Sequence, residues 1–64
     1  MNQRLMHDVA MALATALLEI VQNCIRPEER LDCFEAFYLA CRAGLESYET
    51  QATRMQQRLR PLSN

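Results

Sequence analysis

Apolar or small residues recur at alternating steps of three and four through the second half of the chain, and this pattern constrains the fold most. The stripe consists of Leu31, Phe34, Tyr38, Cys41, Leu45, Tyr48, Ala52, Met55, Leu59 and Leu62. A helix keeps such a heptad stripe on one side only if another helix covers it. A shorter stripe precedes it and comprises Met6, Ala10, Leu13, Leu17, Ile20 and Cys24. The two stripes predict two helices that pack on each other.

The two stripes meet layer by layer if the chain reverses at Arg26-Pro27. The predicted pairs are Cys24 with Leu31, Ile20 with Phe34, Leu17 with Tyr38, Leu13 with Cys41, Ala10 with Leu45, and Met6 with Tyr48. Asn2 can cap the first helix, and Pro27 suits the first position of the second because that position needs no N–H. We therefore predict an all-α antiparallel helical hairpin over 1–64, with helices at about 3–24 and 27–59, a tight turn at 25–26 and a frayed tail at 60–64.

The small size of the chain makes self-association an expectation. It has 64 residues, half of them hydrophobic, and a formal net charge of −1. A single core of this size rarely stabilises a fold by more than about 3–5 kcal/mol, so such chains usually need a disulfide, a metal or a second copy. The charge argues against general nucleic-acid binding, for which a clearly basic domain is expected.

Second apolar lines on both helices predict where that association occurs. Helix one carries a neighbouring seam, and helix two carries a line of mostly small residues around Gly44, where a glycine costs about 1 kcal/mol relative to alanine. We expect two hairpins to pack on these faces as a homodimeric four-helix bundle. The predicted dimer interface is Met11, Ala14, Leu18, Val21, Ile25, Phe37, Ala40 and Gly44.

Helix two is predicted to extend beyond helix one, which leaves an overhang at Gln51 to Leu62. Its predicted partner-binding residues are Arg54, Met55, Arg58 and Leu59. The segment 28–49 carries six acids against two arginines, so antiparallel association would bring opposite charges together. The arginines of the overhang have two interpretations: a solvated helix end, or a contact for an acidic partner or RNA phosphates.

The sequence offers no set of residues for catalysis or metal binding. His7 and Asp8 are adjacent on a helix and point in different directions, and no nucleophile, base and orienting group can be named. The three cysteines have no CxxC spacing, which favours buried reduced thiols and a cytoplasmic location. The apolar run Val9 to Leu18 is shorter than the roughly 20 residues of a membrane span and ends at Glu19. We expect no enzyme activity, cofactor, metal or membrane partner.

The layout resembles two families of small helical proteins. The Leu17-Leu18-Glu19 run and the spacing of Glu29, Asp32 and Glu35 are similar to the Rop family of plasmid regulators, hairpins that dimerise into four-helix bundles. That resemblance implies RNA recognition on the outer face of the first helices, which here offers no lysine. Val21-Gln22-Asn23, Tyr38 and Tyr48 are loosely similar to phycobilisome-degradation proteins of the NblA type.

The expected role is therefore a non-enzymatic protein–protein interaction module. It would be a small homodimeric adaptor, regulator or co-chaperone that binds another protein. Two alternatives stay open: a Rop-like RNA-binding regulator, and a purely structural oligomer with no further partner.

Overall fold

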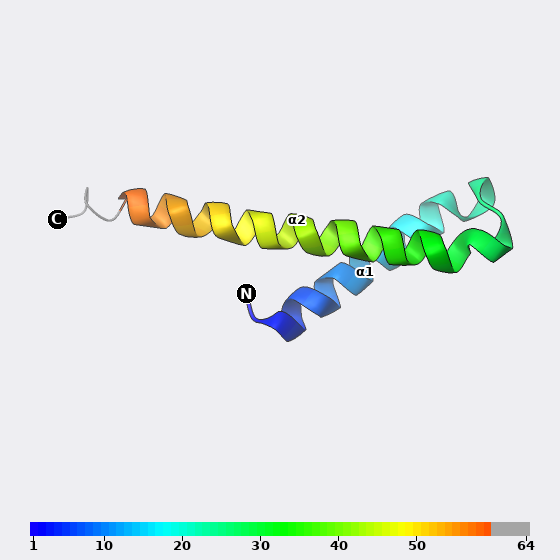
Figure 1. The fold of residues 1–64 in the computed structure, drawn as a ribbon, viewed down its shortest axis with the longest axis horizontal. Helices are drawn as coiled ribbons and strands as arrows, with labels where there is room; N and C mark the ends of the chain where they lie inside the picture. The colour runs from blue at the N-terminus through cyan, green and yellow to red at the C-terminus, as the bar shows by residue number, and fades with distance from the viewer. Residues whose placement is uncertain (60–64) are drawn as a thin grey trace.

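The computed structural model describes residues 1–59 and confirms an all-helical hairpin (Figure 1). The first helix, α1, spans Gln3–Val21 and continues into a 3-10 turn, η1, at Gln22–Cys24. A second 3-10 turn, η2, at Pro27–Glu29 leads into the long helix α2, Arg30–Leu59. The tail predicted at 60–64, with Leu62, lies outside the described residues.

Local signals mark the start of α1 and the start of the second helical segment. The Asn2 side chain caps α1 by accepting a hydrogen bond from the Leu5 amide at 2.7 Å. Pro27 occupies the start of η2, and the Glu29 amide donates to the Arg26 carbonyl at 2.9 Å. The chain reversal is broader than a two-residue turn, because a 3-10 turn lies on each side of Ile25 and Arg26.

The contact between the helices is centred on small residues of α1. Met6, Ala10 and Ala14 are 1%, 0% and 0% exposed, and they follow each other at steps of four. Ridges of that spacing pack into each other when two helices cross at about 50°, whereas a heptad stripe favours about 20°. Alanine side chains allow the two backbones to approach closely at the crossing. Figure 1 shows α1 crossing α2 and leaving it at the open end of the hairpin.

This crossing overturns part of the predicted layer-by-layer pairing: Met6 and Ala10 are buried and Phe34, Tyr38, Cys41 and Leu45 are half-buried as predicted, but other layers are not. Leu13, Leu17 and Ile20 were expected in the hairpin core but are 44%, 38% and 75% exposed. Leu31 and Tyr48 on α2 are 76% and 69% exposed, and Cys24 is exposed. From Ala14 to the turn, α1 instead contacts α2 through the neighbouring seam, in which Leu18, Val21 and Ile25 are half-buried. Because the two helices cross more steeply than heptad packing requires, the face of α1 that is buried against α2 is turned away from the heptad stripe.

The hairpin is elongated and exposes much more surface than a globule of its mass. It measures 57 × 21 × 13 Å with a radius of gyration of 16.2 Å, against about 11 Å expected for a compact chain of this length. Its accessible surface is 5358 Å², and a compact monomer of 7.4 kDa would expose about 4,200 Å². The elongated shape leaves a large part of both helices exposed.

Candidate interaction surfaces

One edge of the hairpin is held by a polar cluster around the Tyr38 hydroxyl. This hydroxyl accepts a hydrogen bond from Nη1 of Arg42 at 2.7 Å and lies 2.8 Å from Nδ1 of His7, to which it can donate. The His7 and Tyr38 rings meet edge to face with centroids 5.4 Å apart. Nη2 of Arg42 donates to the Gln3 side chain. The cluster fixes how α1 lies along α2, and it places Tyr38 beside His7 rather than beside Leu17 alone.

Arg42 keeps its charge within this cluster. The hydrogen bond to Tyr38 raises the pKa of Arg42 above its ordinary value, and partial burial opposes that rise. The Glu46 carboxylate, whose Oε1 lies 3.6 Å from Nε of Arg42, raises the pKa further. The guanidinium is therefore a permanent donor to both helices.

Replacing Tyr38 with phenylalanine should weaken the hairpin without changing its shape. The ring stays, but the hydroxyl that joins His7 to Arg42 is lost, which should lower the free energy of unfolding by about 1 kcal/mol. Urea unfolding followed by circular dichroism measures the change. Tyr48→Phe is the matched control, because within residues 1–59 the Tyr48 hydroxyl makes no hydrogen bond; equal losses in both variants would contradict the role of the cluster.

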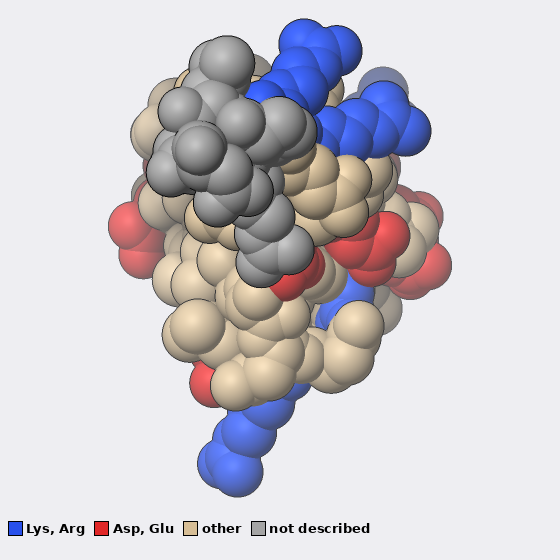
Figure 2. Space-filling view, turned by 90° about the vertical axis from the view of Figure 1, so that its left-hand side faces the viewer, with Lys and Arg blue, Asp and Glu red and all other residues tan. Residues whose placement is uncertain are grey.

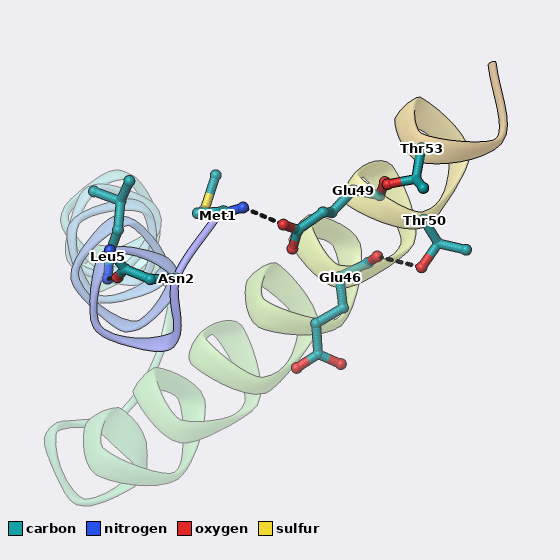
Figure 3. Close-up of polar contacts among 7 residues, drawn as sticks. All are labelled: Met1, Asn2, Leu5, Glu46, Glu49, Thr50 and Thr53. Carbon is teal, nitrogen blue, oxygen red and sulfur yellow. Dashed lines mark hydrogen bonds and ion pairs between the residues drawn. The ribbon is translucent and has the colours of Figure 1, made fainter. Parts of the chain in front are cut away.

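A second polar contact joins the start of the chain to α2. The Met1 amino group forms an ion pair with the Glu49 carboxylate, and Figure 3 shows the two groups facing each other across the gap between the helices. Next to this contact, the Thr50 and Thr53 hydroxyls donate to the carbonyls of Glu46 and Glu49, each at 3.0 Å. This contact lies on the same side as the Tyr38 cluster.

The opposite edge of the hairpin is apolar and formed by both helices. Successive residues of a helix point about 100° apart, and the two helices run antiparallel. On each helix, some residues lie about a quarter-turn around the helix from the interhelical contact, on the side away from Tyr38 and His7. These residues of the two helices therefore line a single edge of the hairpin. We call this surface the apolar edge; it consists of Leu13, Leu17 and Ile20 of α1 and Phe37, Ala40, Gly44 and Tyr48 of α2. No Asp, Glu or Arg lies on the same line between these residues.

The predicted dimer-interface residues are distributed over several environments. Ala14 is fully buried within the hairpin, so its side chain has no surface left for a second molecule. Leu18, Val21, Ile25 and Phe37 are half-buried, while Met11, Ala40 and Gly44 are exposed. The sequence reasoning missed Leu13, Leu17 and Ile20 as surface residues because it assigned them to the core. The four-residue spacing of Ala10 and Ala14 is the signal that could have identified the steeper crossing. Dimerisation itself stays a prediction.

The predicted partner-binding residues are exposed on α2 beyond α1. Met55 and Leu59 are 62% and 60% exposed. An open depression of about 240 Å³ is lined by Gln51, Arg54, Met55 and Arg58. All four belong to one helix, so the depression is a gap between neighbouring side chains. Viewed from this end of the molecule, basic side chains project at the top and at the bottom of the view, while acidic side chains lie between them around an uncharged surface (Figure 2).

Reactive groups do not gather into a site in the part of the chain that the structure describes. No group of three or more His, Cys, Asp or Glu side chains is placed to hold a metal ion within residues 1–59. Cys33 and Cys41 are half-buried free thiols, and Cys24, which was predicted on the core stripe, is an exposed one.

The helical stretch Gln3–Cys24 passes a length-and-composition test for a membrane-spanning helix. Its mean hydropathy reaches 1.4 over 18 residues, and 17% of that window is buried within the hairpin. The apolar stretch is therefore longer than the run from Val9 to Leu18 suggested. Core helices of soluble proteins and N-terminal signal sequences pass the same test, so the result is weak evidence for a membrane.

Comparison with protein-family models, curated proteins and solved structures finds no match to this chain.

Proposed function

We propose that the protein is a non-enzymatic interaction module that self-associates through the α2 residues of its apolar edge and presents the α1 residues of that edge to another protein. The observation that carries this proposal is the apolar edge, an uncharged surface to which both helices contribute. Large exposed apolar surfaces of this kind mark sites of protein contact in soluble proteins.

The small core of the hairpin supports self-association. Only Met6, Ala10 and Ala14 are fully buried within the described chain, which is a small core for 64 residues. Burying the apolar edge would supply the stabilisation that the hairpin lacks by itself.

The surface of α1 supports a further protein partner more than RNA. Its apolar edge presents Leu13, Leu17 and Ile20, which suit a helix-in-groove contact. The outer face that a Rop-like protein would use carries Asp8 and Glu19, whose charges repel phosphates. An adaptor, regulator or co-chaperone role is therefore our proposal for the biological task.

The absolute mass in solution tests self-association. Light scattering on a sizing column, over a range of concentrations, should give twice the chain mass of 7.4 kDa. A mass that stays at one chain up to high micromolar concentration would contradict the homodimer and would assign the apolar edge to a different protein.

A paired capture experiment tests the partner surface. The wild-type chain and a Leu17→Gln, Ile20→Gln variant are compared as baits after circular dichroism shows equal helicity. A protein retained by the wild type and lost with the variant supports the role of the α1 surface, and equal retention by both baits contradicts it.

A further inference from the structure

We propose that two copies of the chain pack antiparallel through α2, with Gly44 at the two-fold axis and Glu29 of each copy paired with Arg58 of the other. This inference rests on the proposed self-association and assigns the arginine overhang to a second copy of the chain instead of a different protein.

The environment of Gly44 points to a close contact from outside the hairpin. A Cβ atom at this position would meet nothing within 4 Å, so the packing of the described chain does not require glycine there. Glycine in the middle of a helix is nevertheless unfavourable relative to alanine. Exposed Ala40 and Ser47 lie one turn before and after it on the same side. Small residues at such spacing allow two helix backbones to approach closely.

The residues around Gly44 are complementary in an antiparallel pair. Tyr48 and Ala40 are four residues after and before Gly44, so Tyr48 of each copy would lie over Ala40 of the other. Tyr48 is 69% exposed in the hairpin, and the small Ala40 leaves room for its ring. Met55 and Cys33 are related in the same way, eleven residues on either side. Each copy thus places large side chains opposite small ones.

The charges decide the orientation. Glu29, the last residue of η2, lies fifteen residues before Gly44, and Arg58 of α2 lies fourteen after it; both residues are exposed. In an antiparallel pair centred on Gly44, these opposite charges meet at both ends of the contact. A parallel pair would place like charges together instead. Glu29 has only a 3.8 Å contact with Arg26 in the hairpin, and its side chain remains 53% exposed.

The length of α2 fits this arrangement. The contact would extend from Glu29, at the end of η2, to Arg58 of α2, about 40 Å of helix. It leaves Leu17 and Ile20 of α1 outside the dimer contact and open to a further partner.

Charge reversal tests the orientation. Dimer dissociation constants are measured by sedimentation equilibrium at low salt for the wild type, Glu29→Arg, Arg58→Glu and the double variant. Each single reversal should weaken the dimer about tenfold, because two exposed pairs become repulsive at once. The double variant should return to within about threefold of the wild type. Glu28→Arg is the matched control: Glu28 precedes Glu29 in η2 but points about 120° away from it, so its reversal should change the constant less than threefold.

The outcomes separate this inference from the proposed function. A wild-type dimer whose affinity the double reversal fails to restore would overturn the antiparallel register while leaving self-association standing. A wild-type chain that is monomeric in the absence of any substitution would contradict the proposed function itself, and the register with it.

Discussion

An Ala14→Leu substitution should remove a large part of the stability of the hairpin. Ala14 is 0% exposed at the point where the helices cross, and a leucine there forces the two backbones apart. Overpacking of this kind costs about 1–3 kcal/mol. A single core of this size stabilises the fold by only about 3–5 kcal/mol, so the loss approaches the whole stability. Thermal unfolding monitored by circular dichroism at 222 nm measures it.

Ala12→Leu is the control for this experiment. Ala12 is exposed on the same helix, and leucine has nearly the same helix propensity as alanine. The control should melt close to the wild type. Equal melting temperatures for the two variants would show that the helices do not cross at Ala14.

A Gly44→Leu substitution should change the monomer and the dimer in opposite directions. Nothing in the described chain lies within 4 Å of a Cβ at this position, so the hairpin should gain about 0.5–1 kcal/mol from better helix propensity. In the proposed dimer, two leucines would meet at the two-fold axis and separate the helices. We expect the dimer dissociation constant to rise about a hundredfold, which corresponds to overpacking by about 3 kcal/mol.

Two measurements detect the opposite changes in monomer stability and dimer affinity. Urea unfolding at low protein concentration reports on the monomer, and sedimentation equilibrium reports on the dimer. Gly44→Ala should stabilise the monomer to a similar extent with a smaller effect on the dimer, because a methyl group displaces the helices less. A Gly44→Leu chain that dimerises as tightly as the wild type would exclude Gly44 from the contact.

The ends of the elements were predictable from single residues. Asn2 caps α1 as its side-chain chemistry indicates, Pro27 begins the second helical segment, and α2 extends without a break to Leu59. These features depend on the backbone donors and acceptors of a few neighbouring residues, so they need no knowledge of the rest of the fold.

The face that each helix buries was not predictable from the stripe alone. The sequence contains two overlapping apolar lines on α1, one through Leu13 and Leu17 and one through Ala14 and Leu18. The sequence alone favours the first line as the buried one, because its apolar side chains are larger. The structure uses the second between Ala14 and the turn, since Ala10 and Ala14 let the helices approach closely. Because the second line is the buried one, Leu13, Leu17 and Ile20 remain exposed on the apolar edge.

The polar contacts, too, were predictable from the sequence only in part. The sequence predicted that Tyr38 lies on the contact stripe, and the structure places it there, half-buried. That the Tyr38 hydroxyl meets His7 and Arg42 depended on how far α1 slides along α2.

The sequence by itself determined that the chain forms two unequal helices joined near Pro27, because periodicity and capping act locally along the chain. The tertiary structure alone decided which apolar line is buried and which is left exposed. The physical reason is that side-chain volume at the crossing, through Ala10 and Ala14, sets the crossing angle and rotates each helix about its own axis.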